Sequence, residues 1–525
     1  MNQQSKIKKI LKHFKEKNSG TETEFIETSL PFSTELNKNE QELKQLLGKS
    51  PDLIFRNFPI HFADGDTQQA LIVYLDGLVL EAAIRESVIK PLVDDKPLQK
   101  DNLQTLGQIQ ERLSTKRITE ENNLSTAIQQ MYKGKVLLIV DGIDKGLIIH
   151  VEAFEFLRAV EEPTSEKNVR GARDGFIESA SANISLLRRR ISHPSLKFDV
   201  LKLGEISQTT IVIAYVDGIC DQALLNRIKG RLNQIKVDAI NNGGEIEQLI
   251  EDHPYSIFPT IGNTERPDKG AFLLLEGRIL IFCDGDPVSL FIPTLFMDNT
   301  KAIEDYYSRP YFSSFVRLLR FAAMLISTTL PALYLSALNF NKELIPSDLL
   351  VPIIQAREMV PFSLWMELFF MIGMFEVVRE AGVRLPQQVG AALSIVGALI
   401  LGQVAVSAGI VGAPTIVVIS ITYISAFVLT PMMEIVSLVR IGLLIASMIL
   451  GPFGLIVTIL GLLTHMVSLT SLNVPYMSPL APAILTDFKD TFIRFPTRLL
   501  KNRRRSVPNK KDIKIQSLPD TGEKQ

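Results

Sequence analysis

The hydrophobic and polar positions along the chain divide it into two unlike halves. In residues 1–310, short apolar runs alternate with charged stretches, which is typical of a water-soluble unit. From Phe321 to Leu469, long apolar runs are interrupted by few Lys or Arg, which is typical of helices that cross a bilayer. The pattern therefore predicts a soluble front half followed by a membrane domain.

Two phrases in the front half are near repeats of each other. ALIVYLDG ends at Gly77 and TIVIAYVDG ends at Gly218; each is an apolar, β-branched run that closes on Asp-Gly and is followed by a helical pattern. A second matching pair, GKVLLIVDGIDKGLII from Gly134 and KGAFLLLEGRILIFCDGDP from Lys269, reads as two short strands around a tight turn. The repeats predict two related α/β subdomains that arose by duplication.

The aspartates of these turns could be catalytic or metal-binding carboxylates, but each one precedes Gly, where a short side chain caps the backbone of a turn. We interpret them as turn residues: Asp76, Asp141, Asp217 and Asp284. The sequence contains no GxGxxG, Walker A, HExxH or nucleophile-elbow motif, so no enzyme, cofactor or metal is expected. Cys220 and Cys283 lie far apart and are expected to be buried apolar residues.

A basic segment, VRGARDGFIESASANISLLRRRI, separates the repeats. Its second half has helical spacing and ends in three arginines, where cations complement the helix dipole. One interpretation is a surface helix with a basic cap. The other is an exposed docking or anion-binding surface between the subdomains, and its candidates are Arg170, Arg173, Arg188, Arg189 and Arg190.

Five apolar segments are candidate membrane spans. They comprise residues 321–340, 361–378, 389–411, 414–430 and 436–469. Arg309, Arg317 and Arg320 precede the first span, and by the positive-inside rule they place the soluble half in the cytoplasm. The last segment is either one long helix or two short passes folded at residues 451–454, and the basic residues that follow it favour two passes.

Polar and small residues within the spans are candidate membrane sites. Glu367 is expected to face water or a polar partner rather than lipid, and to select cations in a pore; a structural hydrogen bond to a neighbouring helix is the alternative. Glu376 can pair with Arg379, and Gln403 is a third polar candidate. Small residues at every fourth position of the third span predict close helix packing, unless they cluster by chance: Gly390, Ser394, Ala398 and Gly402.

Four longer motifs resemble one protein family. They are RGARDGFIESASANISLLRRRI, SRPYFSSFVRLLRF, AREMVPFSLWMELFFMIGMFEVVREAGVRLPQQVG and NVPYMSPLAP. In this order they are similar to segments of the A subunits of spore germinant receptors in endospore-forming bacteria. The resemblance covers residues 40–485 or so and does not indicate which nutrient is recognised.

The resemblance implies a subunit of the inner spore membrane, beside a permease-like B subunit and a lipoprotein C subunit, in a complex that senses nutrients and triggers germination. It also implies a homo-oligomeric, nutrient-gated cation channel whose soluble half lies in the cytoplasm. A non-conducting scaffold and a secondary transporter are the alternatives. Membrane lipid is a further expected partner, whereas 56 basic against 57 acidic residues give no argument for nucleic acid.

The expected fold is therefore α+β with membrane α-helices: two related soluble α/β subdomains followed by a polytopic transmembrane helical domain. The expected divisions are a polar N-terminal segment (1–50), the first subdomain (51–165), a connecting basic helix (166–192), the second subdomain (193–305), the transmembrane domain (306–485) and a basic polar C-terminal tail (486–525).

Overall fold

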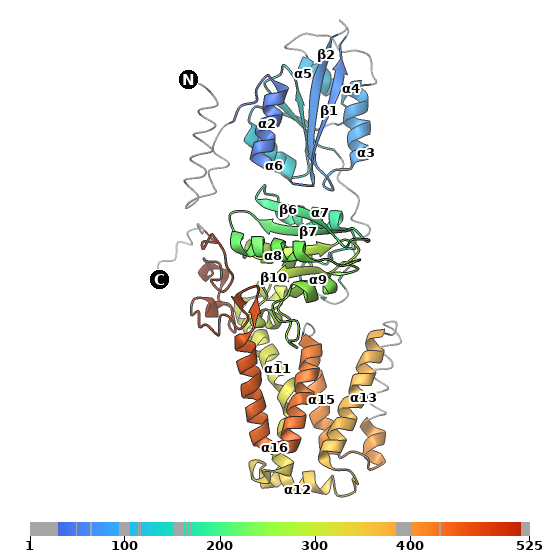
Figure 1. Ribbon diagram of the computed structural model, residues 1–525, viewed down its shortest axis with the longest axis vertical. Helices are drawn as coiled ribbons and strands as arrows, with labels where there is room; N and C mark the ends of the chain where they lie inside the picture. The colour runs from blue at the N-terminus through green and yellow to red at the C-terminus, as the bar shows by residue number, and fades with distance from the viewer. Residues whose placement is uncertain are drawn as a thin grey trace.

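The computed structural model describes residues 30–48, 50–62, 66–93, 105–113, 115, 117–151, 162–163, 166, 170–384, 402–429 and 432–515. Figure 1 shows two sheets, one beyond the other, and a group of long helices at the far end. We call these parts the α/β domain (residues 30–305) and the helical domain (residues 310–468). The C-terminal segment (residues 469–515) returns to the boundary between them.

The first sheet has five antiparallel strands in the order β1-β2-β4-β5-β3. Its centre is buried because all of β4 (VLLIV) and residues 70–75 of β2 (ALIVYL) are apolar and can pack on both faces. The strands are β1 (Leu53–His61), β2 (Thr67–Leu75), β3 (Ile118–Glu121), β4 (Val136–Val140) and β5 (Gly146–Ile149). The helices are α2 (Leu36–Leu47), α3 (Glu81–Ile84), the π-helix η2 (Arg85–Ile89), α4 (Lys90–Val93), α5 (Thr105–Arg112) and α6 (Leu124–Tyr132).

The second sheet repeats this arrangement, with the order β6-β7-β9-β10-β8. Position by position its strands match those of the first sheet, and β7 carries the second copy of the repeated phrase. The strands are β6 (Leu196–Leu203), β7 (Thr209–Val216), β8 (Gly262–Thr264), β9 (Ile279–Cys283) and β10 (Ser289–Ile292). The helices are α7 (Ala180–Arg190), α8 (Gln222–Gln234), α9 (Gly243–Ile250) and α10 (Pro267–Leu275).

The match extends to single hydrogen bonds that hold one helix in each unit. The buried amide of Asn39 accepts from Ser33 N at 2.8 Å and donates to Ser33 O at 2.6 Å. Asn183 makes the same pair of bonds with Ile177, at 2.9 and 2.6 Å. Helix α7 is therefore the counterpart in the second unit of α2 in the first.

The Asp-Gly turns also act alike in the two units. The Asp141 carboxylate accepts from Leu36 N at the start of α2, and the Asp284 carboxylate accepts from Ala180 N at the start of α7. The glycines after them have φ of 84° and 92°, a left-handed region that favours Gly. These aspartates hold turns and helix ends, as the Asp-Gly pattern indicates.

Two expected boundaries need correction. Residues 180–190 are not a connector: Ile184 and Leu187 of α7 pack in the core of the second unit with Phe198 and Phe282. Likewise residues 36–47 belong to the first unit and not to a separate polar segment, because the apolar face of α2 is buried on the first sheet. Each unit thus begins with the helix that covers its sheet.

Among its described residues, the helical domain contains two helices that are long and apolar enough to cross a membrane by length and composition, α11 and α16, and a shorter apolar helix, α15. The expected spans fall in α11, α13, α15 and α16, whereas most of the third span lies outside the described residues. The helices are α11 (Pro310–Asn339), the 3₁₀-helix η6 (Lys342–Leu344), α12 (Ser347–Gln355), α13 (Leu364–Arg384), α15 (Ala413–Phe427) and α16 (Met433–Ser468).

Helix α16 folds back on itself at Gly451, whose φ of 59° and ψ of −139° are not helical. Val436 and Met466, near its two ends, belong to one hydrophobic cluster. A straight helix would separate them by about 45 Å at 1.5 Å per residue. The segment therefore forms two antiparallel arms, which is the folded-back alternative of the last apolar segment.

We expect Gly451→Ala to destabilise the helical domain by about 1–3 kcal/mol, because a side chain is strained at this backbone conformation. An added Cβ would also lie 2.6 Å from the ring of Phe340. Thermal denaturation of the full chain in detergent measures the loss. Gly442→Ala, in the first arm and with no atom within 4 Å of an added Cβ, is the control and should melt like the parent. Equal melting of both variants would contradict the strained turn.

The C-terminal segment is not a polar tail up to residue 515. It contains β11 (Thr470–Ser471), β12 (Val474–Pro475) and the 3₁₀-helices η8 (Asp487–Lys489) and η9 (Thr497–Leu499). Lys510 N donates to Ile219 O at 2.9 Å and Arg503 Nε donates to Leu275 O at 2.7 Å. Val507 is fully buried, so the segment is packed against the second unit of the α/β domain.

Candidate functional site

Arg188 joins the two units of the α/β domain. Its guanidinium contacts the Asp52 carboxylate of the first unit, with Nε to Oδ2 at 2.8 Å, and NH1 donates to Leu196 O at 2.9 Å. It also lies between the rings of Tyr132 and Phe198, 5.0 and 4.8 Å from their centroids. Arg188 is 0 % exposed, so the expectation that it belongs to an exposed docking surface is wrong. Arg188 instead binds Asp52 of the other unit of the same chain.

The neighbouring basic groups extend this contact or face solvent. Lys197 Nζ donates to Leu47 O at 2.5 Å, across the same boundary, and burial together with Arg188 lowers the pKa of Lys197. Arg190 pairs with Asp174 at 2.6 Å. The other three docking candidates, Arg170, Arg173 and Arg189, are exposed.

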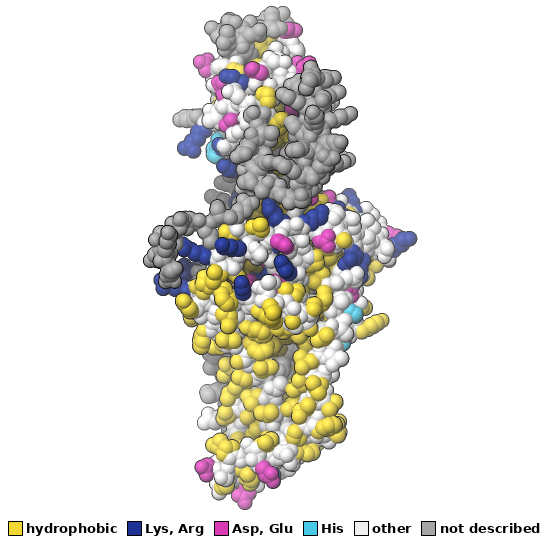
Figure 2. Space-filling view, turned by 90° about the vertical axis from the view of Figure 1, so that its left-hand side faces the viewer, with side chains coloured by type: hydrophobic (Ala, Val, Ile, Leu, Met, Phe, Trp, Pro, Cys, Tyr) yellow, Lys and Arg dark blue, Asp and Glu magenta, His cyan; other side chains and the backbone are white. Residues whose placement is uncertain are grey.

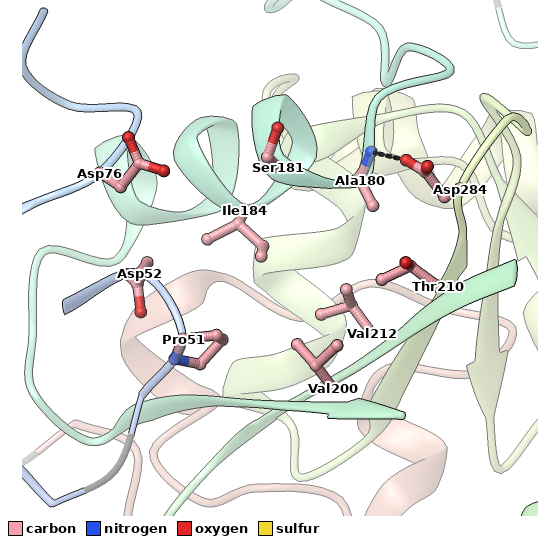
Figure 3. Close-up of a pocket in the computed structure, with 10 residues that line it drawn as sticks. All are labelled: Pro51, Asp52, Asp76, Ala180, Ser181, Ile184, Val200, Thr210, Val212 and Asp284. Atoms are coloured by element: carbon pink, nitrogen blue, oxygen red, sulfur yellow. Dashed lines mark hydrogen bonds between the residues drawn. The ribbon is translucent and has the colours of Figure 1, made fainter. Parts of the chain in front are cut away.

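A cavity of about 310 Å³ lies beside Arg188, where the units meet. Figure 3 shows Asp52 and Asp76 of the first unit at one side and Asp284 of the second sheet at the other, with Ile184 between them. Both units contribute to the wall, so the volume of the cavity depends on their relative position. No group of described residues, here or elsewhere, has three or more His, Cys, Asp or Glu side chains placed to hold a metal.

Glu367 is held by groups of its own chain. The carboxylate accepts from Arg357 NH2 at 2.7 Å, from Gly412 N at 3.0 Å and from Thr415 Oγ1 at 3.1 Å. Gly412 is the N-cap of α15, so this carboxylate lies at the positive end of a helix dipole. Glu367 is 1 % exposed and meets polar partners rather than lipid. This arrangement supports the structural alternative and not the pore-lining role.

The remaining polar candidates of the helical domain differ in their surroundings. Glu376 pairs with Arg379 at 2.8 Å and accepts from Ser437 Oγ at 2.7 Å, so it links α13 to α16. Gln403 is exposed. Gly402 is buried, and a Cβ placed there would lie 3.7 Å from Ile416 of α15, which agrees with close packing. The other packing candidates lie outside the described residues: Gly390, Ser394 and Ala398.

A second charged cluster, which we call the junction, joins the helical domain to the α/β domain. At its centre, the Asp490 carboxylate of the C-terminal segment accepts from Arg317 NH1 at 2.8 Å, Arg504 NH2 at 2.6 Å and Tyr306 Oη at 2.6 Å. Arg317 is on α11 and also contacts Asp305 at 2.9 Å. Tyr306 ends the 3₁₀-helix η5 (Ile303–Tyr306), which precedes α11.

The junction continues into the second unit. Arg504 contacts Asp298 at 3.3 Å, in the 3₁₀-helix η4 (Phe296–Thr300), and Arg278, next to the second sheet, pairs with Asp298 at 2.7 Å. Lys514 pairs with Glu276 at 2.6 Å. Burial alone would raise the pKa of Glu276, but Arg504 and Lys514 lower it. One set of charges therefore ties α11, the second sheet and the C-terminal segment together.

Sequence patterns missed the junction because its members lie far apart in the chain. Asp490 is 173 residues from Arg317, and no local motif contains both. Arg317 and Arg320 looked like flanking charges of the positive-inside kind. The sequence did contain one signal of a charged cluster. Residues 485–505 include seven basic residues and only two acidic ones, Asp487 and Asp490.

Two described helices of membrane-spanning length and composition, joined to a large α/β domain, are typical of a membrane-associated protein. The chain belongs to the family described as Bacillus/Clostridium GerA spore germination protein, whose model matches residues 41–506. The family expected from the motifs is thereby confirmed, and with it a role in germination and the mixed α/β front half.

The chain is similar to individual proteins along most of its length and, over its front half, to a solved domain. The chain is 40% identical to spore germination protein KA of Bacillus subtilis, over 92% of this chain and 88% of the relative. It is 36% identical to the uncharacterized membrane protein YfkQ of the same organism, over 89% and 90% of the two chains. A solved structure is also similar: the crystal structure of the N-terminal domain of the A subunit of the Bacillus megaterium spore germinant receptor GerK3. The two sequences are 33% identical, the match covers 51% of this chain and 98% of that chain, and the TM-score is 0.41.

Proposed function

We propose that this chain is the A subunit of a nutrient-sensing germinant receptor and that it triggers germination as an oligomeric, nutrient-gated cation channel. The observation that carries the role in germination is the family match over residues 41–506. Its partners in this proposal are a permease-like B subunit, which binds the nutrient, a lipoprotein C subunit and further copies of the chain. Its site is the inner spore membrane.

In this proposal α11, α13, the expected span of residues 389–411, α15 and both arms of α16 cross the membrane, so the chain returns to the side from which it entered, and the α/β domain lies on the spore-core side. Two observations support that orientation. The C-terminal segment returns to the α/β domain, so the chain enters and leaves the helical domain at one end. Figure 2 shows basic side chains above the apolar surface of the helices and acidic ones at the far end, which agrees with the positive-inside rule.

A route from the α/β domain to the helices follows from the two charged clusters. The cavity and Arg188 lie where the two units meet, and the junction ties the second unit to α11 through Asp490 and Arg317. A change in the relative position of the units would therefore reach α11 through ion pairs and packed strands. We propose this path as the link between the α/β domain and the gate.

We expect Glu367→Gln to impair folding and leave ion selectivity unchanged. The neutral side chain removes the counter-charge of Arg357 and of the α15 N-terminus, at a cost of about 1–3 kcal/mol. Thermal denaturation of the full chain and the reversal potential of reconstituted protein measure the two effects. Glu380→Gln, on the exposed face of the same helix, is the control and should change neither. Normal folding with an altered reversal potential would restore the pore-lining role.

Cation flux through the purified chain in liposomes tests the channel, with and without the B subunit and nutrient. Nutrient-dependent flux supports it. Normal assembly with the B subunit but no flux under any condition would favour the non-conducting scaffold. Transport of a solute against its gradient would favour the secondary transporter instead.

A further inference from the structure

The first three turns of α11 have their charged side chains inside and their apolar side chains outside. Arg317 is 2 % exposed and, like Arg320, is turned toward Asp305. The opposite face carries exposed side chains at positions i, i+1, i+4, i+7 and i+8, which share one side of a helix. They are Tyr311, Phe312, Phe315, Leu318 and Leu319.

This pattern is the reverse of that of a helix on the surface of a water-soluble domain. A helix on the surface of a soluble domain buries its apolar stripe and exposes its charges. Here Tyr311 is 88% exposed and Phe315 is 62% exposed, while the arginines of the same turns are enclosed. Exposed large apolar patches mark surfaces that meet another protein or a membrane. Something apolar therefore covers this face.

The stripe continues without a break into the part of α11 that is expected to span the membrane. Leu325, Ile326 and Leu333 lie on the same side and are exposed as well. Thirty residues of helix measure about 45 Å, which matches the thickness of a bilayer with its headgroups rather than the ~30 Å hydrocarbon layer alone. The length and the unbroken stripe both favour lipid as the cover.

The C-terminal segment extends the same surface around α11. Phe492 packs on Phe321 with ring centroids 5.2 Å apart, and the adjacent Ile493 is exposed. Exposed basic residues border the apolar ones, namely Arg309 at the N-cap of α11 and Lys489 in η8. Aromatic residues at the headgroup level and basic residues beside an anionic surface are the usual composition of a membrane interface.

We propose that Tyr311, Phe312, Phe315, Leu318, Leu319 and Ile493 form an interfacial collar that lies among the headgroups of the bilayer and prefers anionic phospholipid. The proposal rests on the proposed membrane location of the helical domain. It places the first three turns of α11, and the Arg317–Asp490 pair behind them, at headgroup depth. In the register expected from the sequence, where the hydrocarbon span begins at Phe321, Tyr311 and Phe312 would lie beyond the headgroups, in water.

The single tryptophan of the chain, Trp365, makes the depth measurable. We would introduce Phe315→Trp, or Leu325→Trp as the membrane control, into a Trp365→Phe background of the full chain, reconstituted in phosphatidylcholine and phosphatidylglycerol vesicles. Ten residues of helix separate the two positions by about 15 Å. We expect lipids brominated near the headgroup to quench position 315 most, lipids brominated near the chain end to quench position 325 most, and aqueous acrylamide to quench neither strongly.

Each of the other outcomes would contradict a specific part of the proposal. If position 325 is quenched by lipid and position 315 by acrylamide, the collar is wrong while the membrane location stands. If lipid quenches neither, the membrane location fails as well. If neither lipid nor acrylamide quenches position 315, a protein surface covers the face, and the proposal is overturned.

Brominated phosphatidylglycerol tests the anionic preference against brominated phosphatidylcholine at position 315. A nearby basic residue is expected to raise the relative affinity for the anionic lipid roughly fivefold. The double substitution Arg309→Gln and Lys489→Gln should bring the ratio close to one without changing the depth of quenching. Equal quenching by the two brominated lipids in the Phe315→Trp chain, with Arg309 and Lys489 unchanged, would overturn the preference for anionic lipid.

Discussion

Replacing Arg188 by Gln is expected to destabilise the α/β domain by about 3–5 kcal/mol, because the substitution leaves the Asp52 carboxylate buried without its cation. The two rings that enclose the guanidinium also lose their partner. Hydrogen exchange of the core amides of β2 and β7 in the full chain measures the effect. The exchange of amides that are exposed only by global unfolding should become roughly 100- to 4000-fold faster.

Two matched variants separate this interpretation from a general loss of charge. Arg189→Gln removes the adjacent, exposed arginine and should shift stability by less than about 0.5 kcal/mol. The double substitution Arg188→Met with Asp52→Leu removes both buried charges and should recover much of the loss, since neither charge is then left buried without its partner. A chain that tolerates Arg188→Gln as well as Arg189→Gln would show that the two units do not depend on this pair.

Asp490→Asn should release the C-terminal segment from α11. The neutral side chain removes the carboxylate that Arg317 and Arg504 share and leaves both arginines with only their other carboxylate partners, at a cost of about 3–5 kcal/mol. Tryptic cleavage within residues 498–511 of the full chain should become roughly 100-fold faster or more. Asp512→Asn, an exposed position in the same segment, is the control and should be cleaved like the parent. Unchanged cleavage of Asp490→Asn would refute the junction as the anchor.

The pH dependence of the junction follows from the same carboxylate. Burial alone would raise the pKa of Asp490, but Arg504, Lys301 and Arg317 hold it well below its ordinary value. The stability that Asp490 contributes is therefore fully present above the pKa of the unfolded carboxyl, about 3.9, and is lost as the pH falls below that value. Proteolysis of the parent segment should thus stay slow between pH 5 and 8, approximately the range in which carboxylates remain charged, while Asp490→Asn is cleaved rapidly at neutral pH.

Local patterns predicted the parts of the fold that neighbouring residues determine. The repeated strand-turn-helix phrases indicated two alike units, and both sheets have the same strand order. The basic residues after the last apolar segment favoured a fold-back at residues 451–454, and the structure places the turn at Gly451, in a conformation that only Gly adopts without strain. The burial of Arg188 could also have been predicted from the helical pattern. Arg188 lies four residues after Ile184 and one after Leu187, on the apolar face of α7, although its charge suggested a surface position.

Contacts between distant residues could not be predicted in this way. Glu367 looked like an isolated charge because its partners are Arg357 in the preceding loop and Gly412, 45 residues further on. The junction draws on residues between Glu276 and Lys514, and Asp490 at its centre pairs with Arg317, 173 residues earlier in the chain. Periodicity identifies the face of an element but not the element that it meets.

The position of Asp490 in the chain also sets the order in which the protein can be assembled. Arg317 is synthesised 173 residues before Asp490, a delay of roughly 10–35 s at ordinary rates of translation. During that interval the α/β domain and α11 exist without the clamp between them, and the helices that follow α11 must take their places first. The junction therefore closes as a late step of biogenesis. A chain that terminates before residue 487 would keep both sheets and every described helix of the helical domain, yet would leave the two domains unlocked.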